Sequence, residues 1–187
     1  MSICKPAFGG ILLVMVTAAT AGPAENNFID SLSLTYGNGQ SDTNVYRLGI
    51  QHAWDRSWFT NGNWHVTGYW NAEVGHWHSG KGGGHESDLY DLGLTPIFRL
   101  EQKSSHSGHL APYAEAGIGL HMVSPTSIGD RNLASVFQFG NNLGVGFRFG
   151  SHGRYDLGYR FQHISNAGLS QPNQGMDIHT VNIRVDL

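Results

Sequence analysis

A histidine, a serine and an aspartate lie close together near the end of the chain. They are His163, Ser165 and Asp177, in the stretch YRFQHISNAGLSQPNQGMD that covers residues 159–177. His163 and Ser165 are two positions apart, so on a strand both side chains leave the same face. An imidazole can take the proton of a neighbouring hydroxyl, and a carboxylate can orient the imidazole, which is the chemistry of a nucleophilic triad. The spacing alone is a weak indication, because the chain has 11 histidines.

The first 24 residues have the features of a secretory signal peptide. Lys5 gives a positive start, residues 8–16 form an apolar run too short to span a bilayer, and Ala19-Thr20-Ala21 is a small-residue cleavage site. We expect cleavage near residues 21–24. Cleavage removes Cys4, the only cysteine of the 187 residues, so the exported domain, residues 25–187, has no disulfide.

The composition of the remaining chain favours a single β domain. It is rich in glycine and aromatic residues, and no apolar run of helical period follows the signal peptide. A net charge of −3 with 13% charged residues argues against a nucleic-acid partner.

Alternation of apolar and polar residues predicts eight strands. They cover approximately residues 28–36, 46–51, 64–77, 87–101, 109–120, 135–149, 154–163 and 180–187. The number is even, and several strands are long enough to cross a membrane at the tilt used by membrane barrels.

The two faces of these strands distinguish between the β architectures. One face is apolar almost without interruption, and the other carries glycines and balanced charges: Arg47, Arg99, Arg148, Arg154, Arg160 and Arg184 with Glu73, Asp91, Glu101, Glu115, Asp156 and Asp186. A soluble sandwich, or a lipocalin-like barrel with its apolar face inward, does not need this balance. A narrow barrel with charges inside does, because buried charges must pair. We therefore predict an all-β fold, an eight-stranded antiparallel transmembrane β-barrel.

Export and strand alternation set the expected orientation. With a periplasmic N-terminus, residues 38–43, 77–86, 121–134 and 164–176 form the outer loops, and residues 55–63, 102–108 and 150–153 the inner turns. His163, Ser165 and Asp177 then face the membrane at its outer leaflet. Polar groups beside lipid are costly enough to suggest a function on a lipid substrate. The alternative is that they are hydrated polar residues at strand ends.

Several segments resemble one known family. HISNAGLSQPNQGMD is similar to the signature of the lipid A 3-O-deacylases (PagL-like outer-membrane esterases), in which His-x-Ser-Asn-Ala is followed by an acidic residue fourteen positions after the histidine. Further similar segments are YRLG at 46–49, WDRSW at 54–58, TGYW at 67–70, PYAEAGIG at 112–119 and GDRNL at 129–133. Together they extend over most of the exported chain.

The resemblance implies a role for each residue of the motif. Ser165 is the nucleophile, His163 the general base and Asp177 the orienting acid, while Asn166 and the backbone amide of Gly168 form the oxyanion hole. The chain departs from the family at the acid, where glutamate is usual. Asn166 has a second interpretation as a turn residue.

The resemblance also implies the reaction and its setting. The expected activity is hydrolysis of the ester-linked 3-hydroxyacyl chain at the 3-position of lipid A, with no cofactor and no metal. The expected partner is lipid A or lipopolysaccharide in the outer leaflet of a Gram-negative outer membrane, and the chain can also form a homodimer. Two alternatives remain: a non-catalytic barrel that serves as an adhesin or envelope anchor, and another lipid esterase or acyltransferase.

The other histidines are expected to have no catalytic role. His76, His78 and His85 flank a glycine-rich loop and are expected to be solvated rather than to bind metal. Six others are expected at the surface or the membrane interface, with His179 beside the site: His52, His106, His109, His121, His152 and His179.

Overall fold

The structure is a computed structural model that describes residues 28–81, 84, 86–103 and 110–187. The expected signal peptide, His85, His106 and His109 lie outside these residues. The eight long strands are β1 Ser31–Gly39, β2 Thr43–Ala53, β3 Trp64–Ser79, β4 Asp88–Gln102, β5 Ala111–Ser124, β8 Phe137–Phe149, β9 Tyr155–Ser165 and β10 Met176–Asp186.

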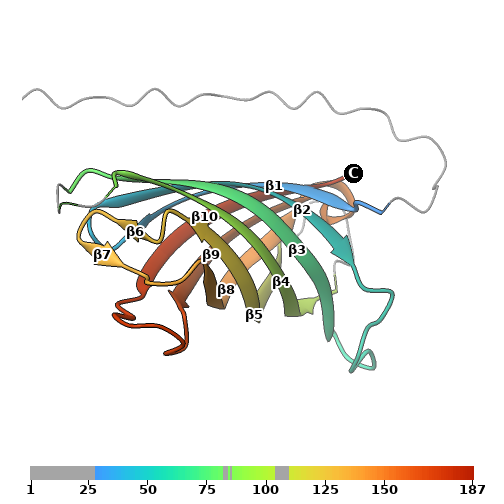
Figure 1. Cartoon of the computed structure of the whole chain (residues 1–187). Coiled ribbons are helices and arrows are strands. Elements are labelled where there is room, and N and C mark those ends of the chain that lie inside the picture. The colour runs from blue at the N-terminus through green and yellow to red at the C-terminus, as the bar shows by residue number, and fades with distance from the viewer. Residues whose placement is uncertain (1–27, 82–83, 85, 104–109) are drawn as a thin grey trace, which may run out of the picture.

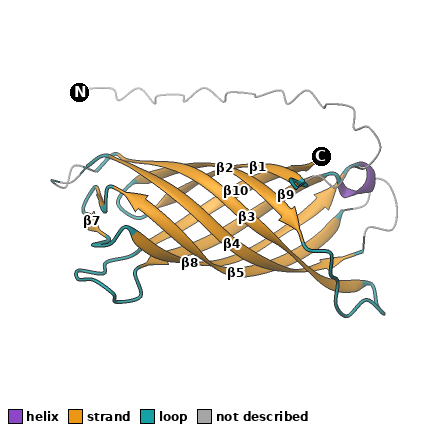
Figure 2. Ribbon diagram, turned by 45° about the vertical axis from the view of Figure 1, so that its right-hand side comes forward, coloured by secondary structure: helices purple, strands orange, loops and turns teal. Residues whose placement is uncertain are grey.

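These strands close into one antiparallel barrel, as predicted. The order around the barrel is β1-β10-β9-β8-β5-β4-β3-β2, and β1 pairs with both β2 and β10. The strands are tilted strongly against the barrel axis (Figure 2). Because β1 and β10 are neighbours, residues from the two ends of the chain lie side by side.

Two small elements complete the described fold. β6 Ser127–Ile128 and β7 Arg131–Asn132 form a short hairpin between β5 and β8, and a 3-10 turn covers Ser151–Gly153. The hairpin lies at the same end of the barrel as the orange-red loop between β9 and β10, away from the C-terminus (Figure 1). In the described residues, no helix has the length and apolar character needed to cross a membrane.

The barrel has its apolar side chains outside and its charged side chains inside. On β4, Leu92 is 58% exposed whereas Arg99 is 1% exposed, and Glu115 on β5 is 6% exposed. This is the reverse of a soluble lipocalin-like barrel, and it is the arrangement that a lipid environment requires.

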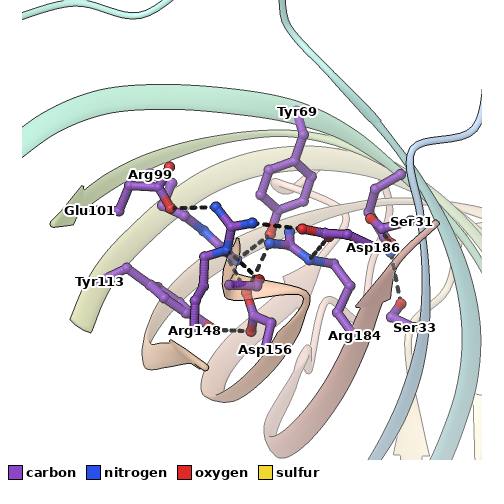
Figure 3. Close-up of polar contacts among 12 residues, drawn as sticks. Ser31, Ser33, Tyr69, Arg99, Glu101, Tyr113, Arg148, Asp156, Arg184 and Asp186 are labelled. Atoms are coloured by element: carbon purple, nitrogen blue, oxygen red, sulfur yellow. Dashed lines mark hydrogen bonds and ion pairs between the residues drawn. The ribbon is translucent and has the colours of Figure 1, made fainter. Parts of the chain in front are cut away.

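Ion pairs and hydrogen bonds fill the middle of the barrel (Figure 3). Glu115 accepts from Arg99 at 2.6 Å and from Arg160 at 2.7 Å, and the Tyr69 hydroxyl adds a bond of 2.9 Å. Asp156 pairs with Arg184 at 2.8 Å and accepts a hydrogen bond from Tyr113 at 2.6 Å. The pairing expected for buried charges is therefore present.

The outer-loop end of the barrel interior is apolar, which the sequence did not indicate. Its fully buried side chains come from the strands and from the hairpin segment: Val45, Trp77, Leu89, Val123, Ile128, Leu133, Ile164, Met176 and Ile178. Three of them, Ile164, Met176 and Ile178, alternate with the candidate catalytic residues on β9 and β10. Since a one-residue slip would expose them, their burial fixes which side chains face outward.

His121 corrects one expectation. It was expected at the surface or interface, but its side chain is fully buried inside the barrel, 3.2 Å from Asp91 and 3.2 Å from the Gln162 amide. The reason is that β5 continues to Ser124 and keeps its phase, which places His121 on the inner face with Gly117 and Gly119.

Candidate active site

His163 and Asp177 are direct cross-strand partners on β9 and β10. Nδ1 of His163 lies 2.6 Å from Oδ1 of Asp177. The two side chains are 42% and 37% exposed, on the membrane-facing side of the barrel. The contact leaves Nε2 of the ring available as a proton acceptor, which is the tautomer a general base needs.

Ser165 lies two residues beyond His163 on the same face of β9 and is half-buried. Gly175 packs against both residues: a Cβ on this glycine would lie 3.3 Å from Cε1 of His163 and 3.5 Å from Cβ of Ser165. Within the described part of the chain, no hydrogen bond joins the Ser165 hydroxyl to the ring. In an unliganded site such bonds are often long and shorten when substrate binds.

The predicted oxyanion donors already have partners in the loop between β9 and β10. The Asn166 amide nitrogen donates to the carbonyls of Leu133 and Ser170 at 2.9 and 3.0 Å. The Gly168 amide donates to Oδ1 of Asn166 at 2.9 Å. Asn166 is fully buried, and these hydrogen bonds of its side chain hold the turn, whose left-handed residues are Ala167 and Gly168 and not Asn166.

One contact of the site was not found from the sequence. Oδ2 of Asp177 accepts a hydrogen bond from Nε2 of Gln40 at 3.2 Å. Gln40 lies between β1 and β2, 137 residues away, and the local sequence around it contains no motif. Only the closure of β1 onto β10 brings the two residues together.

A charged network connects the outer loops beside the site. The Asp130 carboxylate accepts from Ser41 and from Lys81. Arg131 donates to the Ser41 hydroxyl at 3.4 Å and to the Gln174 carbonyl at 3.3 Å. The hydrogen bonds from Lys81 and Ser41 lower the pKa of Asp130 to about 2.

Three of the other histidines, His76, His78 and His179, make outward-facing contacts. His76 and His78 each lie 2.9 Å from the same oxygen of Asp88, across the β3–β4 pair, and all three are exposed. Their shared partner, Asp88, was not predicted from the sequence. His179 lies two residues after Asp177 on β10 and also faces outward. Its Nδ1 lies 2.6 Å from the Tyr159 hydroxyl oxygen.

Inside the barrel, Glu73, Asp91 and His121 form a compact group of the residue types that bind metals. Arg47 is paired with Asp91 at 3.1 Å and with Glu73 at 3.5 Å. The positive charge of the Arg47 guanidinium therefore balances the two carboxylates. We do not infer a metal site from Glu73, Asp91 and His121.

An imidazole with a carboxylate partner, beside a serine hydroxyl and open to the lipid, is suited to acid–base and nucleophilic chemistry on a membrane substrate. The fold defines the class, a membrane β-barrel, and His163, Ser165 and Asp177 lie together on its membrane-facing wall.

Comparison with known proteins identifies the family. Residues 44–186 match the family model described as Lipid A 3-O-deacylase (PagL). Two proteins named lipid A deacylase PagL are each 32% identical: that of Pseudomonas aeruginosa over 94% of this chain and 96% of its own, and that of Bordetella bronchiseptica over 93% and 91%. The crystal structure of the outer membrane enzyme PagL matches with a TM-score of 0.74 and 33% identity, over 84% of this chain and 99% of that one. The chain belongs to the PagL family, and it is an enzyme of the Gram-negative outer membrane.

Proposed function

We propose that the chain hydrolyses the ester that links a 3-hydroxyacyl chain to the 3-position of lipid A, by a Ser-His-Asp acyl-enzyme mechanism. The observation that carries the mechanism is the 2.6 Å contact between His163 and Asp177 on the membrane-facing wall, with Ser165 beside it. The choice of substrate is supported by family membership, since the relatives are named lipid A deacylases.

In the first half-reaction, Oγ of Ser165 attacks the ester carbonyl carbon while its proton passes to Nε2 of His163. Asp177 stabilises the imidazolium that forms. The bond from the carbonyl carbon to the sugar oxygen then breaks, and His163 returns the proton to that oxygen. The products are an acyl group on Ser165 and a free hydroxyl on the sugar.

In the second half-reaction, water attacks the acyl group while His163 takes a proton from it. The bond to Ser165 breaks, its oxygen regains the proton, and the fatty acid leaves into the membrane. Both half-reactions need only groups of this chain and water.

The oxyanion of each tetrahedral intermediate needs donors near Ser165. Gly168 N–H now donates to the neutral Asn166 amide oxygen. A developing oxyanion is a stronger acceptor than an amide oxygen, so it can take over this donor during the reaction. Asn166 acts in this proposal mainly by holding the turn that presents Gly168.

Export by a signal peptide cleaved near residues 21–24 is part of the same proposal. It places the loops beside His163 at the outer surface, where lipid A lies. Association of two copies remains a prediction from the sequence.

The test is mass spectrometry of lipid A from cells that express the chain. We expect the loss of one 3-hydroxyacyl group with the wild type and no loss with Ser165→Ala or His163→Ala. Asp177→Asn should lower the rate about tenfold or more, because it removes the charge that stabilises the imidazolium. Ser124→Ala is the matched control, since Ser124 is an exposed serine at the outer end of β5.

The outcomes separate the competing functions. Unchanged lipid A from cells with a folded wild-type barrel would support a non-catalytic barrel instead. Loss of acyl chains from phospholipid but not from lipid A would support another lipid esterase. Full activity of Ser165→Ala would exclude the acyl-enzyme.

A further inference from the structure

We infer that Gln40 is a positioning residue for the reaction, which holds the Asp177 carboxylate in the orientation that His163 requires. The inference rests on the proposed function, because it assigns Asp177 a role in the same mechanism. It adds a residue from the opposite end of the chain to the site.

Barrel closure places Gln40 at the site. β1 pairs with β10 up to the partners Gly39 and Ile178, so Gln40, the residue that follows β1, comes level with Asp177. The backbone continues this pairing for one more step, since the Gln40 amide donates to the Asp177 carbonyl at 3.1 Å. The position of Gln40 is thus set by the sheet and not by a free loop.

The Gln40 side chain holds Asp177 at two points. Its Nε2 donates to Oδ2 of Asp177 at 3.2 Å, and its Oε1 accepts from the Asp177 backbone amide at 3.3 Å. The other carboxylate oxygen, Oδ1, faces Nδ1 of His163. Each oxygen of the carboxylate therefore has its own partner, which restricts its rotation about the side-chain bonds.

The segment that carries Gln40 is itself held in place. The carbonyl of Ser41 accepts from the Ser79 hydroxyl at 2.7 Å, and the carbonyl of Asp42 accepts from the Gly80 amide at 3.0 Å. The Ser41 side chain also contacts Asp130 and Arg131. Contacts from two further connections of the barrel, β3–β4 and β5–β8, thus support the segment that carries Gln40.

Such support matters because Asp177 is partly exposed. An aspartate has a short side chain, and without a second partner its carboxylate can turn toward water or polar head groups and lose its alignment with the ring. Small displacements of catalytic groups are costly in rate. Gln40 prevents this rotation from the side opposite His163.

The experiment uses Gln40→Met, which keeps the size of the side chain and removes both polar atoms. We expect kcat to fall about tenfold with an apparent KM for lipid A in micelles within about twofold of wild type, because alignment and not substrate binding is lost. Asn38→Leu is the matched control. Asn38 lies on the same face of β1, but its amide donates to Asn44, and this variant should retain the wild-type rate.

A double-mutant cycle separates positioning from a general structural effect. If Gln40 acts through Asp177, Gln40→Met should cost nothing more in the Asp177→Ala background. A wild-type kcat in Gln40→Met, or equal losses in both backgrounds, would overturn the inference. Absence of deacylation by wild type would instead refute the proposed function, so the two failures are distinguishable.

Discussion

At the residue scale, the site depends on close packing around His163. Gly175 has a positive φ of 63°, and a Cβ at this position would lie 3.0 Å from the Ile164 carbonyl and 3.3 Å from the His163 ring. A glycine suits this position for two reasons: the backbone is left-handed, and a Cβ would be in tight contact with the Ile164 carbonyl and the imidazole, so that one of them would have to shift.

Gly175→Ala should therefore reduce the deacylation rate about tenfold, because the methyl group displaces the ring from its alignment with Ser165 and Asp177. It should also lower the free energy of unfolding by about 1 kcal/mol through backbone strain. The measurements are the initial rate on lipid A and the urea midpoint of the barrel in micelles.

Gly84→Ala separates the two effects. Gly84 also has a positive φ, of 83°, but a Cβ there would meet no atom within 4 Å. This control should keep the wild-type rate, and a Gly175→Ala enzyme as active as the control would show that the glycine does not shape the site.

The sequence predicted those features of the site that depend on residues close together in the chain. His163 and Ser165 share a face because they are two positions apart, and Asp177 follows from strand phase; the structure has all three on the outer face. Gln40 could not be found in this way, since its contact depends on which strands close the barrel. The hydrogen bond from the Asn166 side-chain amide to the Leu133 carbonyl could not be predicted either, because it depends on how two loops pack.

At the scale of elements, contacts of the Asp130 carboxylate hold several outer loops together. This carboxylate from the hairpin segment contacts Ser41 after β1 and Lys81 after β3. Its pKa is lowered from an ordinary 3.8 to about 2. A lowered pKa means that the contact favours the ionised form, so its stabilising effect is present above about pH 4 and is lost as the pH falls toward 2.

We therefore expect the loops to loosen between pH 4 and pH 2, as seen by faster amide hydrogen exchange in residues 37–44, after correction for the intrinsic effect of pH. Asp130→Asn should show the faster exchange already at pH 6, and its exchange should change little over the acidic range. If the variant and the wild type exchange equally at pH 6, Asp130 does not hold this segment.

The elements themselves were largely predictable, because alternation marks each long strand. The strands in the structure agree with the eight expected, and the main differences are at their ends. The hairpin β6–β7 was missed because two-residue strands are too short to show a period. Missing it also hid the apolar cluster, to which this segment contributes Ile128 and Leu133.

At the scale of the whole molecule, the interior of the barrel stabilises the wall on which the site is built. The charge balance was visible in the sequence, but the partners were not, since they depend on strand register and on which strands face each other across the barrel interior. Glu115 is the central acceptor: it pairs with Arg99 and Arg160, and all three side chains are buried. By contrast, the pair of Arg148 and Asp186 lies at the rim and is partly exposed.

This difference in burial predicts different energetic effects. Glu115→Gln leaves buried guanidinium groups without their shared counter-charge and should lower the free energy of unfolding by about 3 kcal/mol or more. Asp186→Asn removes a partly solvated partner of Arg148 and should cost about 1 kcal/mol or less. Urea unfolding in micelles, followed by tryptophan fluorescence, measures both. Equal losses would mean that the interior pairs are as hydrated as the rim, and the barrel would then be stabilised mainly by its apolar outer surface and backbone hydrogen bonds.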